Sequence, residues 1–404
     1  MADVHMTPAF LLGDLESIFR SMPNDYVGLK ARAEGAVRRW QWATDRIHVL
    51  EPLWHERHQF SKGRWLKQVP ADEADQYEYG FDDSSRVRVE RQHVRFEGYP
   101  ERRWCHEIFY FYGADTVDEY RFDYRPEKNV ASFSRASLID GTIVLMEARG
   151  AGGVLRERYS WVDAQVVAVE VEHAEVTAQG GYQELKPRAR YTATYNTRGL
   201  LDELVRQSPG LPGETPAYRQ VVYKRRAKGV TLESLVRALQ PALTDEIVRA
   251  VSRAAIKEPA YRLALAWSPG QTESLPPSIG IGLESYRARL LAGDAPFDAL
   301  MLWNPAECST WVEVRSEAMT SMCQQLNQYC AAHDTWLRAD RMLNDIARDL
   351  SGRQWSAVLP TTPDFFAYVT DVELVDLHRN IKKSCPPDML RSLKSRGLLK
   401  GLGR

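Results

Sequence analysis

The sequence is short of cysteine, of long apolar runs and of net charge. Its 404 residues include 5 scattered cysteines and no Cys-x-x-Cys pair, which argues against a disulfide framework or a zinc site and predicts reduced thiols in the cytoplasm. No apolar run approaches the roughly 20 residues that cross a bilayer, and residues 1–10 lack the basic-then-apolar order of a secretory signal. With 53 basic and 54 acidic side chains, neither nucleic acid nor a membrane is an expected partner.

Core-forming residues, by contrast, are plentiful. The chain is 44% hydrophobic and contains 11 Trp, 18 Tyr and 12 Phe, which argues against global disorder. The residue pattern predicts an α+β protein of two modules. N-terminal helices and an antiparallel β-meander are expected over residues 1–207, a linker over 208–230, and a compact α+β domain over 231–404.

Between about Tyr77 and Thr197, apolar and polar residues alternate with a period of two. One apolar face and one charged face are typical of antiparallel strands with a solvent-facing side. Turn residues separate roughly eight or nine such strands, and no helical stretch lies between them. Sequential hairpins therefore predict a meander, folded as a curved sheet or an open roll.

Helical spacing flanks this region. Leu11–Phe19 carries apolar residues at helical intervals, and the helix is expected to end near Met22–Pro23. A second helix is expected from Tyr26 to about Leu50, and Leu200–Gln207 fits a short closing helix. Ser208–Pro216 contains three prolines and two glycines, which predicts the start of the linker.

The C-terminal part mixes helical and strand patterns. A helix is expected to begin after the cap residue Thr231 and to break at Pro241. A long helical pattern extends from Met319 to Leu337. Three segments fit strands, namely Tyr261–Trp267, Phe297–Trp303 and Asp364–Thr370.

No motif assembles a metal site or a nucleotide site. The glycine clusters Gly150–Gly153 and Gly280–Gly282 complete no phosphate-binding motif and are interpreted as turns. His55 and His58 can share a helix face but lack an evident third ligand. No metal and no cofactor is therefore expected.

An enzyme would need a site assembled from residues that are distant in sequence. His106, Glu107, His173 and Glu175 are the candidate acid–base groups. A satisfied histidine at the edge of the core is the simpler interpretation of His173, because it continues an apolar strand face.

Aromatic residues are dense in the β region. Phe109–Tyr112 are consecutive, so strand alternation sends Tyr110 and Tyr112 to the face opposite Phe109 and Phe111. Tyrosine exposed on a rigid sheet is typical of binding surfaces, although an N-terminal helix could cover that face instead. We predict a binding surface that includes Tyr110, Tyr112, Tyr120, Arg121, Arg158 and Trp161.

The C-terminal segment carries a family resemblance. The segments that show it are Arg353–Pro360, Thr362–Val369, Val372–Leu377 and Ser395–Leu398. These segments resemble the C-terminal end of an uncharacterised bacterial α+β family that is associated with gene neighbourhoods of toxin-immunity (SUKH-type) proteins. The resemblance extends from about Leu232 to the end, brings no catalytic residues, and implies binding rather than catalysis.

The leading hypothesis is a non-enzymatic, cytoplasmic protein-binding protein, such as an immunity-type or toxin-neutralising factor. It rests on the aromatic and charged β surface and on the lack of a convergent catalytic set. The alternatives are an enzyme with acid–base groups from the meander and a scaffold subunit of a larger complex. The sequence identifies neither the partner nor the oligomeric state.

Overall fold

The chain divides into two compact units in a computed structural model. Unit 1 comprises Met1–His55, Ser61–Leu201 and Val205–Arg219, and unit 2 comprises Glu56–Phe60, Asp202–Leu204 and Gln220–Arg404. The structure describes residues 12–58, 60, 62–94, 104–124, 128–177, 182–210, 217–268, 274–293, 298–308, 310–333, 335–371, 374 and 377–402.

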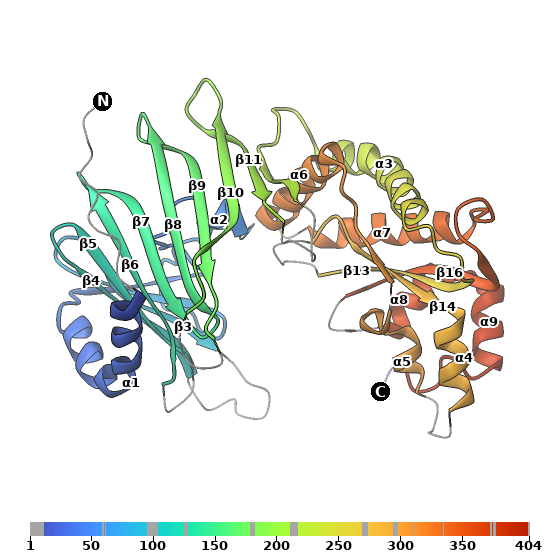
Figure 1. The fold of residues 1–404 in the computed structure, drawn as a ribbon, viewed down its shortest axis with the longest axis horizontal. Helices are drawn as coiled ribbons and strands as arrows, with labels where there is room; N and C mark the ends of the chain where they lie inside the picture. Colours follow the sequence, from blue (N-terminus) through green and yellow to red (C-terminus); the bar gives the residue numbers. More distant parts are fainter. Residues whose placement is uncertain are drawn as a thin grey trace. The chain divides into compact units, whose positions relative to one another are not determined.

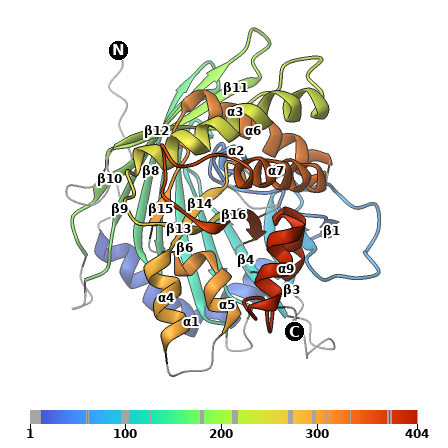
Figure 2. The same ribbon diagram turned by 90° about the vertical axis from the view of Figure 1, so that its right-hand side faces the viewer.

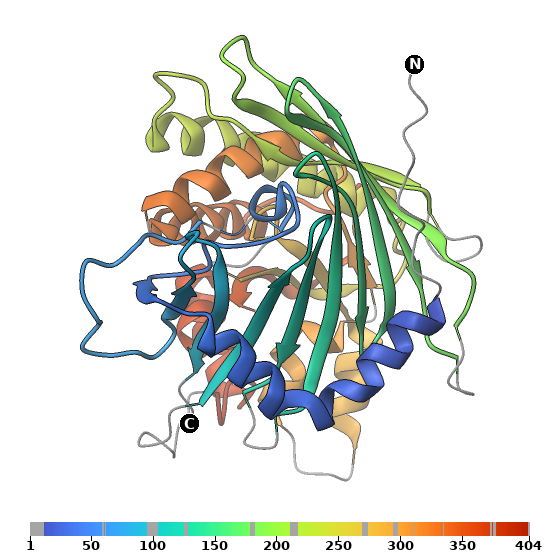
Figure 3. The ribbon, with the colours of Figure 1, turned by 90° about the vertical axis from the view of Figure 1, so that its left-hand side faces the viewer.

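The chain has one large curved sheet, whose first ten strands all lie in unit 1 and whose last strand lies mostly in unit 2 (Figure 1 and Figure 3). Its twelve strands follow one another in sequence order, and the pairs from β1 to β10 are antiparallel. The α+β class and the meander predicted from the sequence are confirmed. The strands are β1 (Arg39–Ala43), β2 (Tyr77–Phe81), β3 (Val87–Val94), β4 (Trp104–Tyr112), β5 (Thr116–Phe122), β6 (Val130–Ile139), β7 (Thr142–Gly150), β8 (Gly153–Val162), β9 (Gln165–Ala174), β10 (Lys186–Tyr195), β11 (Leu201–Ser208) and β12 (Tyr218–Lys224).

Helix α1 (Leu12–Gly35) lies across one face of this sheet, which we call the α1 face (Figure 3). The core beneath it combines helix and sheet residues: Leu15, Met22, Leu29, Ala33, Val89, Phe109, Phe122, Phe133 and Val154. The predicted helix end near Pro23 is wrong, because α1 continues to Gly35. The predicted helix over 26–50 is also wrong, since Arg39–Ala43 pairs in register with β2 and so forms a strand. Sheet pairing there outweighs a helical spacing of apolar residues.

Two further expectations fail at the end of the sheet. Leu201–Ser208 is strand β11 rather than a closing helix, and it adds to the edge left by β10. Strand β12 lies within 208–230, the range assigned to a linker, and pairs with β11. The proline-rich residues 211–216 lie outside the described residues. Open backbone groups at a sheet edge favour another strand over an isolated short helix.

Unit 2 has a four-stranded mixed sheet in the order β15-β14-β13-β16, with helices on both faces (Figure 2). In Figure 2, α3, α6 and α7 lie above the strands, and α4 and α5 lie below them. Strand β13 pairs antiparallel with β14 and parallel with β16. The strands are β13 (Ala260–Trp267), β14 (Ser278–Leu283), β15 (Thr310–Val312) and β16 (Thr361–Asp371). The helices are α3 (Leu232–Arg253), α4 (Glu284–Ala292), α5 (Ala299–Trp303), the 3-10 helix η1 (Pro305–Glu307), α6 (Glu317–His333), α7 (Trp336–Ser351), α8 (Leu377–Ser384) and α9 (Pro387–Ser395), while the short helix α2 (Trp54–His58) precedes β2.

Alternation along the central strands separates two cores in unit 2. On β16, Phe365, Ala367 and Val369 belong to the core with α3, α6 and α7, whereas Phe366 and Tyr368 belong to the core with α5, α8 and α9. The two central strands β13 and β16 are therefore buried on both faces, as is usual for a sheet between helix layers.

Several sequence predictions for unit 2 are confirmed and others are wrong. Thr231 caps α3 through its hydroxyl and the amide of Ser234, at 3.2 Å. Helix α3 nevertheless continues through Pro241 without the predicted break. The predicted strand over 297–303 is helix α5, because Asp298 caps its first turn. The long pattern from Met319 divides into α6 and α7.

Gly280 and Gly282 lie inside β14 rather than in a turn. A Cβ at position 282 would lie 2.4 Å from Nε of Arg262, and one at position 280 would lie 3.0 Å from Sγ of Cys308. These glycines therefore make room for a buried guanidinium and a buried thiol.

Candidate functional site

The two faces of the unit 1 sheet carry two different polar clusters. Strand alternation sends Glu107 and Phe109 of β4 to the α1 face, where α1 contacts both. It sends Tyr110 to the other face, where Glu119 is its neighbour on strand β5. We call this opposite face the Arg46 face, because Arg46 contacts it.

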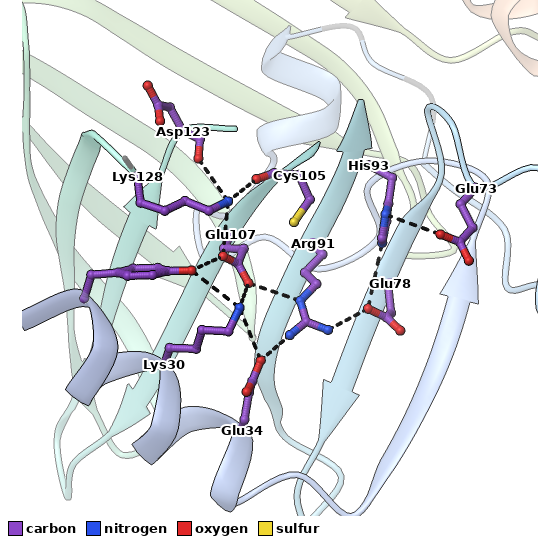
Figure 4. A network of polar contacts seen from close by, with 11 residues as sticks. Lys30, Glu34, Glu73, Glu78, Arg91, His93, Cys105, Glu107, Asp123 and Lys128 are labelled. Carbon is purple, nitrogen blue, oxygen red and sulfur yellow. Dashed lines mark hydrogen bonds and ion pairs between the residues drawn. The ribbon is translucent and has the colours of Figure 1, made fainter. Parts of the chain in front are cut away.

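On the α1 face, Glu107 is the centre of an ionic network (Figure 4). Its carboxylate is 1% exposed and accepts hydrogen bonds from Oη of Tyr26 at 2.5 Å and Nζ of Lys30 at 2.7 Å. Nε of Arg91 and Nζ of Lys128 each lie 3.2 Å from it. Burial alone would raise the pKa of Glu107, but the bonds from Lys30 and Tyr26 lower it to about 2.

The network continues across the first strands (Figure 4). Arg91 also pairs with Glu34 of α1 and, at 2.9 Å, with Glu78 of β2. His93 stands between Glu78 and Glu73, with nitrogen–oxygen separations of 3.8 and 3.9 Å. Each carboxylate here faces at least one cationic or imidazole side chain, so the network serves to hold α1 on the sheet.

These contacts bear on the acid–base groups considered from the sequence. A carboxylate with a pKa of about 2 is a weak proton acceptor near neutral pH, and Glu107 is held by four side chains. His106 belongs to β4 and points to the face opposite Glu107. His173 belongs to β9, five strands away in the sheet order. The structure does not bring these groups together.

On the Arg46 face, charged side chains from the sheet meet an irregular segment. Residues 44–53, which we call the cover segment, form neither helix nor strand. Nε of Arg46 lies 3.0 Å from Glu90 of β3, and Oη of Tyr79 accepts from the amide of Ile47 at 2.9 Å. The ring of His48 packs edge-on against Tyr110, with centroids 4.9 Å apart. These contacts hold the cover segment on strands β2, β3 and β4.

Glu119 and Arg121 of β5 complete this cluster. Nη2 of Arg121 donates to Glu119 at 2.9 Å, and Oη of Tyr110 donates to Glu90 at 3.1 Å. Glu119 and Glu90 are each 1% exposed, whereas the Arg121 side chain is 31% exposed. Solvent therefore reaches the cluster from the side of Arg121.

The cluster moves the pKa values of its acids in opposite directions. Burial would raise the pKa of Glu119, but the guanidinium groups of Arg121 and Arg46 lower it below the ordinary value. Burial, and then the carboxylate of Glu119, raise the pKa of Glu51. Burial lowers the pKa of His48 to about 4, so this ring is neutral at pH 7.

Five polar atoms of this cluster are buried without a hydrogen-bond partner. They are Nη2 of Arg46, Nε2 of His48, Oε2 of Glu51, Oε2 of Glu119 and Nε of Arg121. Buried polar atoms are paired in most native structures, and each unpaired one costs about 1–3 kcal/mol. On the α1 face the carboxylate of Glu107 is fully engaged, although Nε2 of His93 at the edge of that network also has no hydrogen-bond partner.

Two of the six residues predicted to bind from the sequence belong to this cluster. Tyr110 is fully buried and Arg121 is partly exposed. The other four lie elsewhere: Tyr112 donates to the carbonyl of Val87, Tyr120 packs between Phe111 and Phe133 on the α1 face, Arg158 pairs with Glu172 on that same face, and Trp161 donates to the carbonyl of Ile143. The six residues do not form one surface.

Arg46, His48, Glu51, Glu90 and Glu119 were not among the residues predicted from the sequence. Arg46 and His48 lie in the segment interpreted as helix, and Glu51 follows it directly. Glu90 and Glu119 could have been predicted, because strand alternation places each on the same sheet face as the aromatic Tyr110 rather than on a solvent-facing side. A carboxylate on a buried face requires a partner, and the two arginines provide it.

Comparison with known proteins identifies no family. No protein-family model and no curated protein sequence matches the chain. Among solved structures, the chain is similar to a protein of unknown function from Bacteroides fragilis, with 6% sequence identity and a TM-score of 0.19, over 34% of this chain and 83% of that chain. A TM-score this low supports no statement about fold or function.

In the part of the chain that the structure describes, no group of three or more His, Cys, Asp and Glu side chains is placed to hold a metal ion. Among the same residues, no helix is long and apolar enough to cross a membrane.

Proposed function

We propose that unit 1 binds a small polar molecule between the cover segment and the Arg46 face of the sheet. The observation that carries the proposal is the group of five buried, unpartnered polar atoms on Arg46, His48, Glu51, Glu119 and Arg121. A bound molecule with complementary groups would satisfy several of them at once. Convergent polar groups of this kind are typical of small-molecule sites.

Binding at this place requires the cover segment to move. The unpartnered atoms are buried, so a ligand reaches them only after the segment lifts from the sheet. The segment is irregular, and its contacts include the polar bonds of Arg46 and Ile47. Irregular segments open more readily than paired strands.

The test compares two arginines that differ in the sheet face they occupy. Arg121 and Arg158 are 31% and 36% exposed, and each pairs with one glutamate. We would measure the thermal shift of the wild-type chain with defined sugars, amino acids, nucleotides and inorganic phosphate. The shift should disappear in Arg121→Gln and persist in Arg158→Gln. If no compound shifts the wild type, or if both variants behave alike, the proposal is wrong.

A protein partner, as predicted from the sequence, is a second proposal, and exposed tryptophans at the β1 edge favour it. Trp40 and Trp65 are 41% and 42% exposed. Arg91 lies over the Trp40 ring at 4.7 Å, and Trp65 packs on Tyr79 at 5.3 Å, so both rings are held in place. Held, exposed aromatic rings are typical contact residues for a protein partner. In this second proposal the chain itself is the immunity-type or toxin-neutralising factor.

The partner proposal is tested by affinity capture from host lysate at about 0.15 M and 0.5 M salt. One stoichiometric protein should bind the wild type and be lost from Trp40→Ser and Trp65→Ser, while Val162→Ser, which changes another exposed apolar residue, should retain it. We place the protein in the cytoplasm in this proposal, and the five unpaired cysteines support that compartment.

A further inference from the structure

The unpartnered atoms on the Arg46 face include both donors and acceptors. Nη2 of Arg46 and Nε of Arg121 can only donate, and Oε2 of Glu119 accepts when it is ionised. A ligand that only accepts would leave Oε2 of Glu119 without a hydrogen-bond partner. A ligand that only donates would leave Nη2 of Arg46 and Nε of Arg121 without one. The chemical groups that match this mixture are those that donate and accept at once, and a hydroxyl group does so.

Two of these atoms are spaced so that one such group could bridge them. Nη2 of Arg46 and Oε2 of Glu119 are 4.0 Å apart, which is too far for a direct hydrogen bond. A single hydroxyl oxygen about 2.8 Å from each atom could bridge them. Both side chains are more than nine-tenths buried, with exposures of 9% and 1%. This bridge would therefore form in a desolvated place, where hydrogen bonds are strong.

The charges around this position favour an uncharged ligand. Two guanidinium groups, Arg46 and Arg121, face the carboxyl groups of Glu51, Glu90 and Glu119. The positive groups do not outnumber the acids, so an anionic ligand gains no net attraction. An ammonium group only donates, so it would leave Nη2 of Arg46 and Nε of Arg121 without an acceptor.

We infer that the ligand of this site is a neutral compound with several hydroxyl groups, such as a sugar or a cyclic polyol. The inference rests on the proposed function, because it names the class of molecule bound at the same place. Aromatic rings add a second match, since Tyr110 packs against His48 and Arg46 lies 5.3 Å from the ring centroid of Trp54. Rings of this kind can cover the apolar C–H faces of a sugar while the charged groups bind its hydroxyls.

Isothermal titration calorimetry on the full chain tests the ligand class. The neutral probes are glucose, maltose, trehalose, cellobiose and myo-inositol, and the charged probes are inorganic phosphate and lysine. At least one neutral probe should bind more tightly than phosphate and lysine. Its dissociation constant should change less than about two-fold between 0.05 M and 0.5 M salt, because no ionic ligand group is screened.

Two glutamates provide the matched variants. Glu119→Gln should weaken the neutral probe at least about 10-fold, because it removes a buried acceptor. Glu172→Gln, on the α1 face and paired with Arg158, should leave binding unchanged. If Glu119→Gln does not fold, as judged by circular dichroism, the partly exposed Arg121→Gln replaces it, and a loss of at least about 10-fold is expected again.

The outcomes separate the two proposals. Tighter binding of phosphate or lysine that is weakened by salt and by Glu119→Gln overturns the ligand class and leaves the small-molecule site standing. Binding of a neutral probe that ignores both Glu119→Gln and Arg121→Gln overturns the assignment to this site. If none of these probes binds, the ligand class fails, and if no compound of the wider thermal-shift panel shifts the melting temperature either, the proposed function fails with it.

Discussion

Replacing Glu107 with Gln should weaken the attachment of α1 to the sheet. The carboxylate is 1% exposed and is surrounded by Tyr26, Lys30, Arg91 and Lys128. Glutamine keeps the shape of the side chain but removes the negative charge that Lys30, Arg91 and Lys128 share. Breaking a buried ion pair by removing one partner costs about 3–5 kcal/mol. We expect Glu107→Gln to lower the free energy of unfolding of unit 1 by about 3 kcal/mol at pH 7.

The same carboxylate predicts a defined pH dependence. Its pKa is lowered from 4.5 to about 2 in the folded chain, which corresponds to about 3 kcal/mol of stability at neutral pH. Because the folded pKa is the lower one, this stability is present above about pH 4.5 and is lost as the pH falls towards 2. Between pH 5 and pH 3, the wild type should lose about 2 kcal/mol that the Gln variant does not lose.

Urea unfolding at pH 7, 5 and 3 measures both effects, with hydrogen exchange of the α1 amides to assign the transition to unit 1. Glu170→Gln is the control, because Glu170 is 52% exposed and lies 4.0 Å from Arg190; it should change stability by less than about 0.5 kcal/mol. Parallel loss of stability in the wild type and Glu107→Gln between pH 5 and pH 3 would refute the reasoning.

Three further predictions concern backbone positions. Gly282→Ala should destabilise unit 2 by about 1–3 kcal/mol in thermal unfolding, since its Cβ would lie 2.4 Å from Arg262, and an unchanged melting temperature would contradict the packing described here. Gly28→Ala in α1 meets no atom within 4 Å and should raise the urea midpoint of unit 1 by the equivalent of about 0.5–1 kcal/mol; a lower midpoint would show hidden strain. Thr231→Ala should lower the free energy of unfolding of unit 2 by about 1 kcal/mol, because it removes the side-chain cap bonded to the amide of Ser234. Thr231→Asn should retain most of this stability, because asparagine also caps helices.

The regular part of the fold was predictable because one face of each strand is buried. In β10, Ala189, Tyr191 and Ala193 are buried while Arg190 and Thr192 between them are exposed. This period of two persists through consecutive strands separated by turn residues, so the antiparallel meander follows from local pattern alone. The capped start of α3 at Thr231 was readable for the same reason, since a cap acts within its own turn.

The errors occur where tertiary pairing decides between two local possibilities. Arg39–Ala43 and Leu201–Ser208 each carry apolar residues that fit helical spacing, yet both pair with a neighbouring strand. Leu201, Leu204 and Val205 are buried in the strand form. Short segments have marginal helical stability on their own, so an available sheet edge determines their structure. A single sequence does not show that edge.

The candidate site was only half visible for a related reason. Tyr110 and Arg121 could be placed by alternation within their own strands, and both belong to the cluster. Arg46 reaches the same cluster from an irregular segment 44 residues before its partner Glu90. No periodicity encodes such a contact, because it depends on how the cover segment crosses the sheet. Arg46 and its neighbours in the cover segment determine whether the polar groups of the sheet are all hydrogen-bonded or are left open to a ligand. The position of these residues cannot be predicted from the local sequence pattern.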